Sequence, residues 1–170
     1  MHNIWVRLNA VIFFGLTVLL VLATLSAFST YLHKGQPEVR TLRLNTLKSL
    51  RNHGGVDRAL LSFDLNADLS PAFHWNLKQL FVFVVAEYDS EANPLNQVII
   101  WDKIIKSPEE AVLRFKNEFV KYALIDQGSE LRNKTITLKL MWDHMPITGR
   151  LYNGVDGATP FTLPEKYKTS

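Results

Sequence analysis

The chain of 170 residues is long enough for one domain with an added anchor or tail, and its formal net charge is only +3. Because it contains no cysteine, a disulfide framework, a thiol nucleophile and a thiolate metal site are excluded. Its lysines and arginines are scattered among acidic residues and form no basic stripe of the kind that binds nucleic acid.

The first predicted element is a membrane-spanning helix over residues 10–32, preceded by a short N-terminus, residues 1–9. The segment AVIFFGLTVLLVLATLSAFSTYL contains no charged side chain, and about 20 apolar residues suffice to cross a bilayer. Trp5 and Tyr31 lie near its ends, where aromatic side chains favour the headgroup region. A cleaved signal peptide is the alternative, but its apolar region is shorter, about 7–15 residues. We therefore expect an uncleaved signal-anchor.

Small side chains recur at helical spacing near the end of this span, at Ala23, Ser26, Ala27 and Thr30. These positions share one helix face, and small residues there allow a second helix to approach closely. We expect either packing against a transmembrane helix of a partner or simple tolerance of these residues by lipid.

The charges that flank the span do not settle its orientation. Only Arg7 precedes the span, whereas several basic residues, Lys34 and Arg40 among them, follow it. The positive-inside rule alone would place the following residues in the cytosol, but long domains are translocated largely regardless of charge. The triplet NKT at 133–135 is an N-glycosylation acceptor at Asn133, which is modified only on the lumenal side.

Residues 33–38 form a short predicted linker, and alternating hydrophobicity predicts a β-rich domain over residues 39–170. The first strands are predicted at 39–47 and 61–69. In the second of these, the apolar side chains share one face and the polar side chains share the other, as in a half-buried strand. The apolar set is Leu61, Phe63, Leu65, Ala67 and Leu69, and the polar set is Ser62, Asp64, Asn66 and Asp68.

The segments 79–88 and 96–105 are apolar on both faces and predict a hairpin of central strands, joined by a turn at 89–94. Residues 107–119 fit either a short capped helix or a turn that leads into an edge strand. Further strands are predicted at 119–126 and 135–142, and the Gly- and Pro-rich segment 145–164 predicts a short strand with loops. Together these elements predict an antiparallel β-sandwich.

No pattern of catalytic, cofactor-binding or metal-ligating residues is found in the sequence. The histidines have no metal-ligand spacing, and the adjacent Asp143 and His144 would face opposite sides of a strand. The acidic face of Asp64 and Asp68 is more typical of an exposed strand than of a cation site. There is no nucleophile elbow, phosphate loop or dinucleotide fingerprint. A binding or structural domain is favoured over an enzyme, and Trp75, Trp101 and Trp142 are expected to pack in the core or at its rim.

The central segments FHWNLKQLFVFVVAEY, 73–88, and NPLNQVIIWDKI, 93–104, resemble the family of small glycosylated accessory subunits, subunit 3, of the eukaryotic signal peptidase complex. The opening RLNAVIFF, 7–14, and the later FDLNADL, 63–69, fit the same family. The resemblance covers nearly the whole chain. Its central block is specific because many polar identities surround a hydrophobic run.

This resemblance implies a single-pass type II protein of the endoplasmic reticulum membrane, with residues 1–9 cytosolic and the β-sandwich lumenal. It implies glycosylation near Asn133, no protease activity and no cofactor. The implied partners are the catalytic serine protease subunit, which this chain would hold and support during signal-peptide cleavage, the small membrane subunits, and membrane lipid. A stand-alone anchored binding module and a small lumenal enzyme are the alternatives.

The family-motif residues are the candidate partner interface: Trp75, Asn76, Lys78, Gln79, Glu87, Tyr88, Asn96, Gln97, Trp101 and Asp102. Long polar side chains next to strand ends either contact a partner or form hydrogen bonds that fix turns within the domain. Both interpretations remain open from the sequence.

Overall fold

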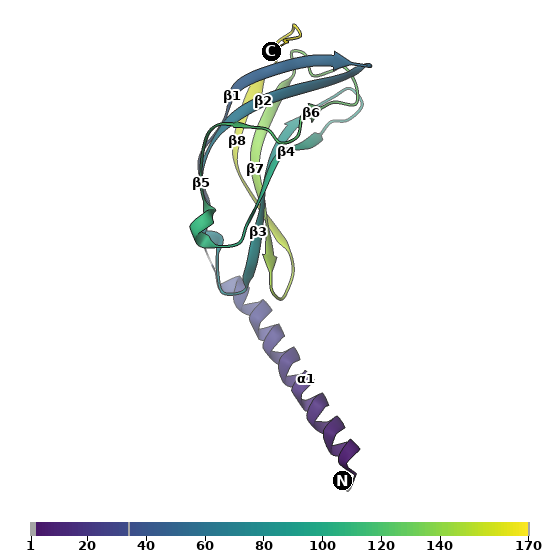
Figure 1. The fold of residues 1–170 in the computed structure, drawn as a ribbon, viewed down its shortest axis with the longest axis vertical. Helices are drawn as coiled ribbons and strands as arrows, with labels where there is room; N and C mark the ends of the chain where they lie inside the picture. Colours follow the sequence, from purple (N-terminus) through teal and green to yellow (C-terminus); the bar gives the residue numbers. More distant parts are fainter. Residues whose placement is uncertain (1–2, 34, 170) are drawn as a thin grey trace.

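The computed structural model describes residues 3–33 and 35–169 and consists of one long helix that projects from a β domain (Figure 1). Residues 1–2 of the predicted N-terminus, Lys34 of the predicted linker and Ser170 lie outside the described residues. The amino terminus of the helix and the C-terminus of the domain lie at opposite ends of the elongated molecule (Figure 1).

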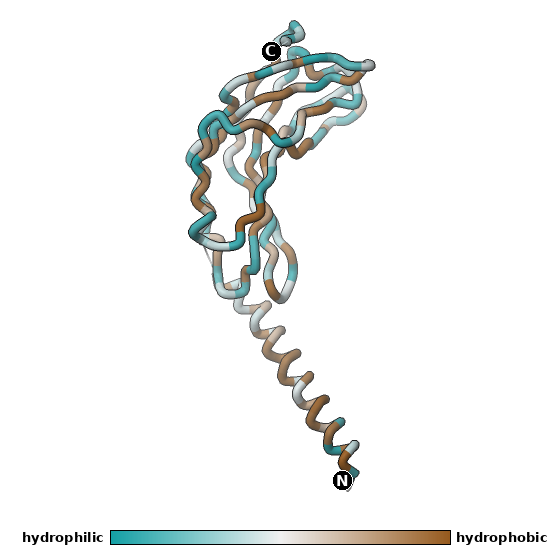
Figure 2. The backbone as a smooth tube through the Cα atoms, viewed as in Figure 1, coloured by the Kyte–Doolittle hydropathy of each residue, from teal (hydrophilic) through white to brown (hydrophobic). Residues whose placement is uncertain are grey.

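Helix α1 covers Ile4–Ser29 and continues as a 3-10 turn, η1, over Thr30–Leu32. Asn3 caps its start, because the Asn3 side chain accepts a hydrogen bond of 3.0 Å from the backbone N–H of Trp5. The helix is hydrophobic along most of its length (Figure 2), and by length and composition it can cross a membrane. The helix begins at Ile4, before the predicted span at residue 10, and the polar residues Arg7 and Asn9 are part of it.

The β domain contains two antiparallel sheets, as expected for a sandwich. The first, sheet A, has the order β1-β2-β5, with β6 also paired to β2; its strands are β1 (Glu38–His53), β2 (Val56–Asp68), β5 (Val112–Phe119) and β6 (Leu124–Ile125). The second, sheet B, has the order β4-β3-β7-β8; its strands are β3 (Leu77–Tyr88), β4 (Asn96–Ile105), β7 (Thr135–Pro146) and β8 (Tyr152–Thr162). Short 3-10 turns lie at η2 (Ser70–Ala72) and η3 (Pro108–Ala111).

The core lies between the sheets and is built from the inward faces of their strands. It includes Leu61 and Phe63 of β2, Leu80 and Val84 of β3, and Trp142 of β7. The C-terminal segment pairs with β1 at one point, where Leu50 and Lys168 exchange backbone hydrogen bonds of 2.8 and 2.9 Å. The predicted mainly β fold with one N-terminal helix is therefore confirmed.

The predicted strand at 96–105 is confirmed as β4, and the segment 107–119 follows the second alternative, a short turn before an edge strand. The prediction of one continuous strand at 119–126 is wrong, because Phe119 is the last residue of β5 and, of the remaining residues, only Leu124–Ile125 pairs as a strand. The backbone N–H of Val120 bonds to Leu61 of sheet A, whereas that of Tyr122 bonds to Ile100 of sheet B. The chain between β5 and β6 is thus bonded to both sheets, which interrupts the strand before it pairs again with β2 at Leu124–Ile125.

Three further sequence predictions need correction. Strands β1 and β2 form one long hairpin that turns at Gly54 and Gly55, whose φ angles of 63° and 83° suit a two-residue turn. Residues 145–164 contain a full strand, β8, rather than a short one. The polar face of β2 is also less exposed than expected: Ser62 and Asp64 are buried, because β1 and β5 flank this strand on both sides.

Candidate functional site

The loop between β7 and β8 lies against the last turns of α1 and fixes the helix to the domain. The Thr148 hydroxyl donates a hydrogen bond of 3.0 Å to the Ser26 hydroxyl. Gly149, with φ +111°, lies so close to Ala27 that an added Cβ would be 3.2 Å from the Ala27 Cβ. The hairpin and the helix are thus one packed unit.

Asn76 connects three segments at this junction and is 1% exposed. Its side-chain Nδ2 donates to the Thr30 hydroxyl at 2.9 Å and to the Thr148 carbonyl at 2.8 Å. Its Oδ1 accepts from the Thr148 backbone N–H at 3.1 Å. A buried amide with its donors and acceptor satisfied holds both partners in one arrangement.

The small-residue face of α1 is the side that meets the domain. In the helical segment 4–32, the side chains that are not fully exposed are Ala23, Ser26, Ala27, Ser29 and Thr30. Three of the four predicted packing residues, Ser26, Ala27 and Thr30, contact the chain's own hairpin or Asn76. Small residues there let the hairpin approach, and packing against a partner helix stays a prediction.

A group of histidine and tyrosine rings lies next to this junction. His144 stacks on Tyr152 with ring centres 4.0 Å apart, and the His74 Nε2 atom lies 3.2 Å from the Tyr152 hydroxyl. The His33 and His74 rings are 4.8 Å apart. Burial, followed by electrostatic repulsion from the neighbouring His33, lowers the pKa of His74. Burial also lowers the pKa of His144, although its hydrogen bond to the Tyr152 carbonyl opposes this.

The outer face of sheet B, which points away from sheet A, carries apolar side chains in its centre. On β3, Phe83 and Val85 are buried but lie outside the core cluster, and Phe81 stacks on Phe83 with ring centres 5.2 Å apart. Three further apolar side chains on this face are exposed. Ile99 and Ile104 of β4 pair with residues of β3, and Val155 of β8 pairs with a residue of β7. An apolar face of this kind is typical of a protein-contact surface.

Polar side chains share this outer face with the apolar ones. Glu87 forms an ion pair with Lys139 and accepts a hydrogen bond of 2.6 Å from Gln97. The hydrogen bond from Lys139, with that from Gln97, lowers the pKa of the Glu87 carboxyl despite its partial burial. Asp102 pairs with Lys121 at 3.5 Å. These polar side chains are therefore paired with one another, and Asp102 lies within the apolar region, because it pairs across the sheet with Phe83.

The comparison with known proteins identifies the family. A sequence profile described as "Signal peptidase subunit" matches residues 1–166. The chain belongs to the signal peptidase subunit family. A relative from Drosophila melanogaster, named "Signal peptidase complex subunit 3", is 36% identical over 178 residues, which cover 100% of this chain and 99% of the relative.

Other members of the signal peptidase subunit family carry the same name, "Signal peptidase complex subunit 3". The relative from Dictyostelium discoideum is 34% identical over 167 residues, covering 98% of this chain and 97% of the relative. The relative from Homo sapiens is 35% identical over 158 residues, covering 89% of this chain and 87% of the relative. The similarity includes both the helix and the β domain.

The residues that suggested this signal peptidase subunit family from sequence divide into two groups in the structure. Buried Tyr88 donates a hydrogen bond of 2.9 Å to Asp126, buried Trp101 packs edge-on against Phe63, and Asn76 lies at the junction. Asn96 bonds to Ser90 at 3.0 Å and fixes the β3–β4 loop. These side chains have internal roles.

The other family-motif residues are accessible to a partner. Trp75 and Lys78 are exposed beside the start of β3, and Gln79 is half-buried with its amide 3.1 Å from the Met145 sulfur. Gln79, Glu87, Gln97 and Asp102 belong to the outer face of sheet B. For these residues the partner interface stays a prediction. The sequence analysis did not predict that the β7–β8 loop contacts α1. The only local signal for this loop was the turn-forming pair Thr148 and Gly149.

The candidate carboxylates do not assemble a metal site within the described ranges 3–33 and 35–169. Asp64 is engaged by Arg43 at 3.1 Å, by Asn45 at 2.7 Å and by the backbone N–H of Asn117 at 2.9 Å. The Asn117 hydrogen bond is the largest cause of the lowered pKa of Asp64. This carboxylate stabilises sheet A.

The predicted glycosylation residue, Asn133, is exposed in the turn before β7, with φ 56°. Since β7 ends at the junction with α1, its start lies at the opposite end of sheet B. An acceptor at this position is accessible and distant from the helix. Its modification stays a prediction.

Proposed function

We propose that this chain is a non-catalytic accessory subunit of a signal peptidase complex, anchored by α1 with its β-sandwich in the lumen of the endoplasmic reticulum. The full-length similarity to proteins named "Signal peptidase complex subunit 3" carries this proposal. The helix, which is long and apolar enough to cross a membrane, supports the anchor. We propose that the whole chain holds and supports the catalytic serine protease subunit beside the membrane.

The arrangement of the histidines supports a non-catalytic role. His33 bonds to the Pro71 carbonyl at 2.8 Å, His74 lies at the Tyr152 hydroxyl, and His144 lies 3.3 Å from the Tyr152 carbonyl. A serine protease needs a hydroxyl nucleophile in reach of such a base. The contacts given above for these three histidines are with carbonyl groups and a tyrosine hydroxyl at the junction, and they stabilise its packing.

The outer face of sheet B supports a role in holding another protein. Its apolar side chains, together with polar neighbours that are paired with one another, have the composition of an interface patch. We propose that this surface, defined by Phe81, Phe83, Ile99, Ile104 and Val155, contacts the catalytic subunit.

The test is purification of the tagged full chain in a gentle detergent, followed by quantification of co-purified subunits. We expect stoichiometric recovery of the catalytic subunit and the small membrane subunits. Ile104→Glu places a charge on the outer face of sheet B and is expected to reduce recovery of the catalytic subunit at least about tenfold, the factor that 1.4 kcal/mol represents. Val112→Glu is the matched control, because Val112 is similarly exposed but belongs to β5 of sheet A.

Recovery of the chain alone, from membranes with an intact peptidase, would reject the accessory role and favour a stand-alone anchored binding module. Equal recovery with both variants would keep the accessory role and reject sheet B as its contact surface.

A further inference from the structure

The tip of the β7–β8 hairpin, residues 147–151, lies beside α1 at a defined depth. It touches the helix at Ser26 and Ala27 through Thr148 and Gly149. The uncharged stretch of the chain continues to Leu32, five residues beyond Ala27. At a rise of about 1.5 Å per residue, the hairpin tip lies about 8 Å inside the end of that stretch.

The side chains at this depth are those that a membrane interface attracts. Ile147 is 66% exposed and Leu151 is 62% exposed, although both are large and apolar. The segment PITGRLY, 146–152, contains no acidic residue, and its single charge is Arg150. Long basic side chains extend from such a position to lipid phosphates. The hairpin tip also has hydrophobic character in the view of the whole chain (Figure 2).

Trp75 adds a further exposed apolar side chain, which lies beside the helix but outside the hairpin. It is 65% exposed and, with Leu19, Leu22 and Ser26, it lines a shallow groove on α1. Tryptophan favours the boundary between hydrocarbon and headgroups. Of the residues that line this groove, Ser26 lies six residues before Leu32, about 9 Å inside the uncharged stretch, and Ser26 is also a contact of the hairpin tip. Trp75 and the hairpin tip thus meet the helix at the same residue.

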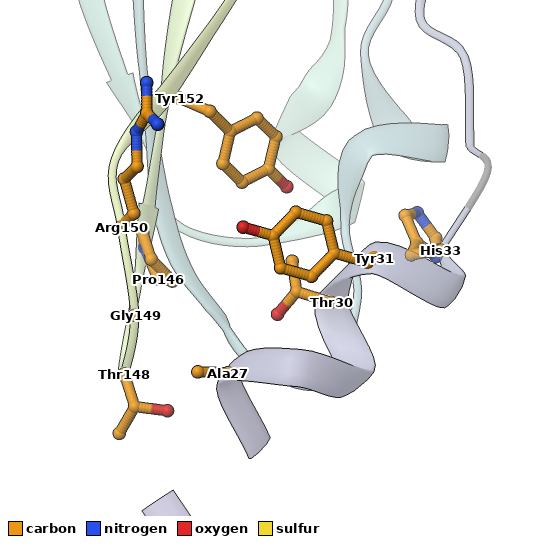
Figure 3. A pocket seen from close by; sticks show the side chains of 9 residues that line it. All are labelled: Ala27, Thr30, Tyr31, His33, Pro146, Thr148, Gly149, Arg150 and Tyr152. Carbon is orange, nitrogen blue, oxygen red and sulfur yellow. The ribbon is translucent and has the colours of Figure 1, made fainter. Parts of the chain in front are cut away.

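A cavity of about 350 Å³ opens between the hairpin and the end of α1 (Figure 3). It is lined by Tyr31 and His33 from the helix side and by Arg150 and Tyr152 from the hairpin side. The rings of Tyr31 and Tyr152 point toward one another across it (Figure 3). Hydroxyls, a guanidinium and aromatic faces at this height match the headgroup layer of a lipid.

We propose that residues 147–151 and Trp75 are embedded in the surface of the lipid bilayer and form a second membrane contact beside α1. This inference rests on the proposed function, in which α1 spans the membrane. Interfacial segments bury their apolar face about 5–10 Å deep, which agrees with the depth of the hairpin tip. Two contacts on one rigid unit fix the tilt of the domain, which a single helix with a flexible linker would leave free.

Depth-dependent fluorescence quenching tests the proposal in the full chain reconstituted into phosphatidylcholine vesicles. Because the chain has no cysteine, single Ile147→Cys and Leu151→Cys variants can be labelled with an environment-sensitive fluorophore. Phe28→Cys marks the helix within the bilayer. Val155→Cys is the matched control, because Val155 is 56% exposed on the same hairpin but farther from its tip.

The quencher is a lipid with a nitroxide near the top of its acyl chain, which acts from within the membrane whichever way the protein inserts. We expect the labels at 147 and 151 to lose as much fluorescence as the label at 28, and the label at 155 to lose almost none. Quenching at 28 without quenching at 147 or 151 would overturn the inference and leave the anchor intact.

Absence of quenching at all four sites would show that α1 is not in the bilayer, which rejects the proposed anchor together with the inference. Quenching of 147 and 151 that disappears in the purified complex would assign the hairpin tip to a partner subunit and would also overturn lipid as its occupant.

Discussion

Gly154 and Trp142 face each other on neighbouring strands of sheet B with almost no space between them. A Cβ added at Gly154 would lie 2.4 Å from the Trp142 ring, below any normal contact distance. The Trp142 Nε1 is buried without a hydrogen-bond partner among the described residues, so the ring is held by packing. Only glycine at position 154 accepts this ring.

Gly154→Ala is therefore expected to lower the free energy of unfolding by about 1–3 kcal/mol, the cost of overpacking a core. Denaturant unfolding of the full chain in detergent measures this change. Asn153→Ala is the control, because Asn153 is exposed on the same strand. An unchanged midpoint for Gly154→Ala would show that Trp142 moves without cost.

The lowered pKa values of His74 and His144 predict a loss of stability in mild acid. An unfolded histidine has a pKa of about 6.5, so the unfolded chain binds more protons than the folded chain just below neutral pH. Folding stability should fall as the pH drops through about 6.5 toward the lower folded pKa values. The slope is at most about 1.4 kcal/mol per pH unit for each proton.

Unfolding measured between pH 7.5 and pH 5 checks this prediction. Replacing both His74 and His144 by Gln should flatten the dependence, whereas His53→Gln, at the exposed end of β1, should leave it unchanged. A slope that persists in the double variant would place the responsible groups elsewhere.

At the scale of elements, the alternation of apolar and polar residues predicted where the strands lie better than it predicted which strands pair with each other. The apolar run at 79–88 indicates a central strand because both faces are buried, and β3 is indeed flanked by β4 and β7. The pairing of β3 with β7 joins segments far apart in sequence, and no local pattern specifies it. The loss of the strand at 119–126 likewise depends on tertiary hydrogen bonds.

The candidate site shows the same limit. Spacing predicted that Ala23, Ser26, Ala27 and Thr30 share a face, but composition does not say what packs there. The chain's own hairpin occupies part of that face through Asn76, a contact between residues far apart in sequence.

Asn76→Ala should loosen the β7–β8 hairpin, because the Thr148 backbone N–H would lose its Asn76 acceptor. An unsatisfied buried donor costs about 1–3 kcal/mol, so cleavage by trypsin after exposed Arg150 should accelerate roughly tenfold or more. Limited proteolysis of the full chain in detergent measures this rate. Asn93→Ala, in the distant β3–β4 loop, is the control. Equal rates would mean that the helix contact and the backbone hydrogen bond from Ile147 to the Asn76 carbonyl hold the hairpin without the Asn76 side chain.

At the scale of the whole molecule, the helix and the acceptor Asn133 define opposite ends. Sheet B runs from the junction, where Leu77 pairs with Pro146, to the far end, where Glu87 pairs with Thr137. In the proposed orientation, Asn133 is raised away from the membrane on a turn that exposes its side chain. The alternative orientation would place the same turn in the cytosol, where it would not be modified.

The full chain expressed in cells should therefore carry one N-linked glycan, seen as a mobility shift that an endoglycosidase removes. Thr135→Val removes the acceptor triplet without changing Asn133, whose φ of 56° suits asparagine, and should abolish the shift. Thr135→Ser keeps the triplet and should retain the shift. A chain that inserts in the membrane yet lacks the shift, with Thr135→Val indistinguishable from the unaltered chain, would contradict glycosylation at Asn133.

Protease protection of the domain in sealed microsomes then decides the orientation, since a lumenal domain is protected and a cytosolic one is digested.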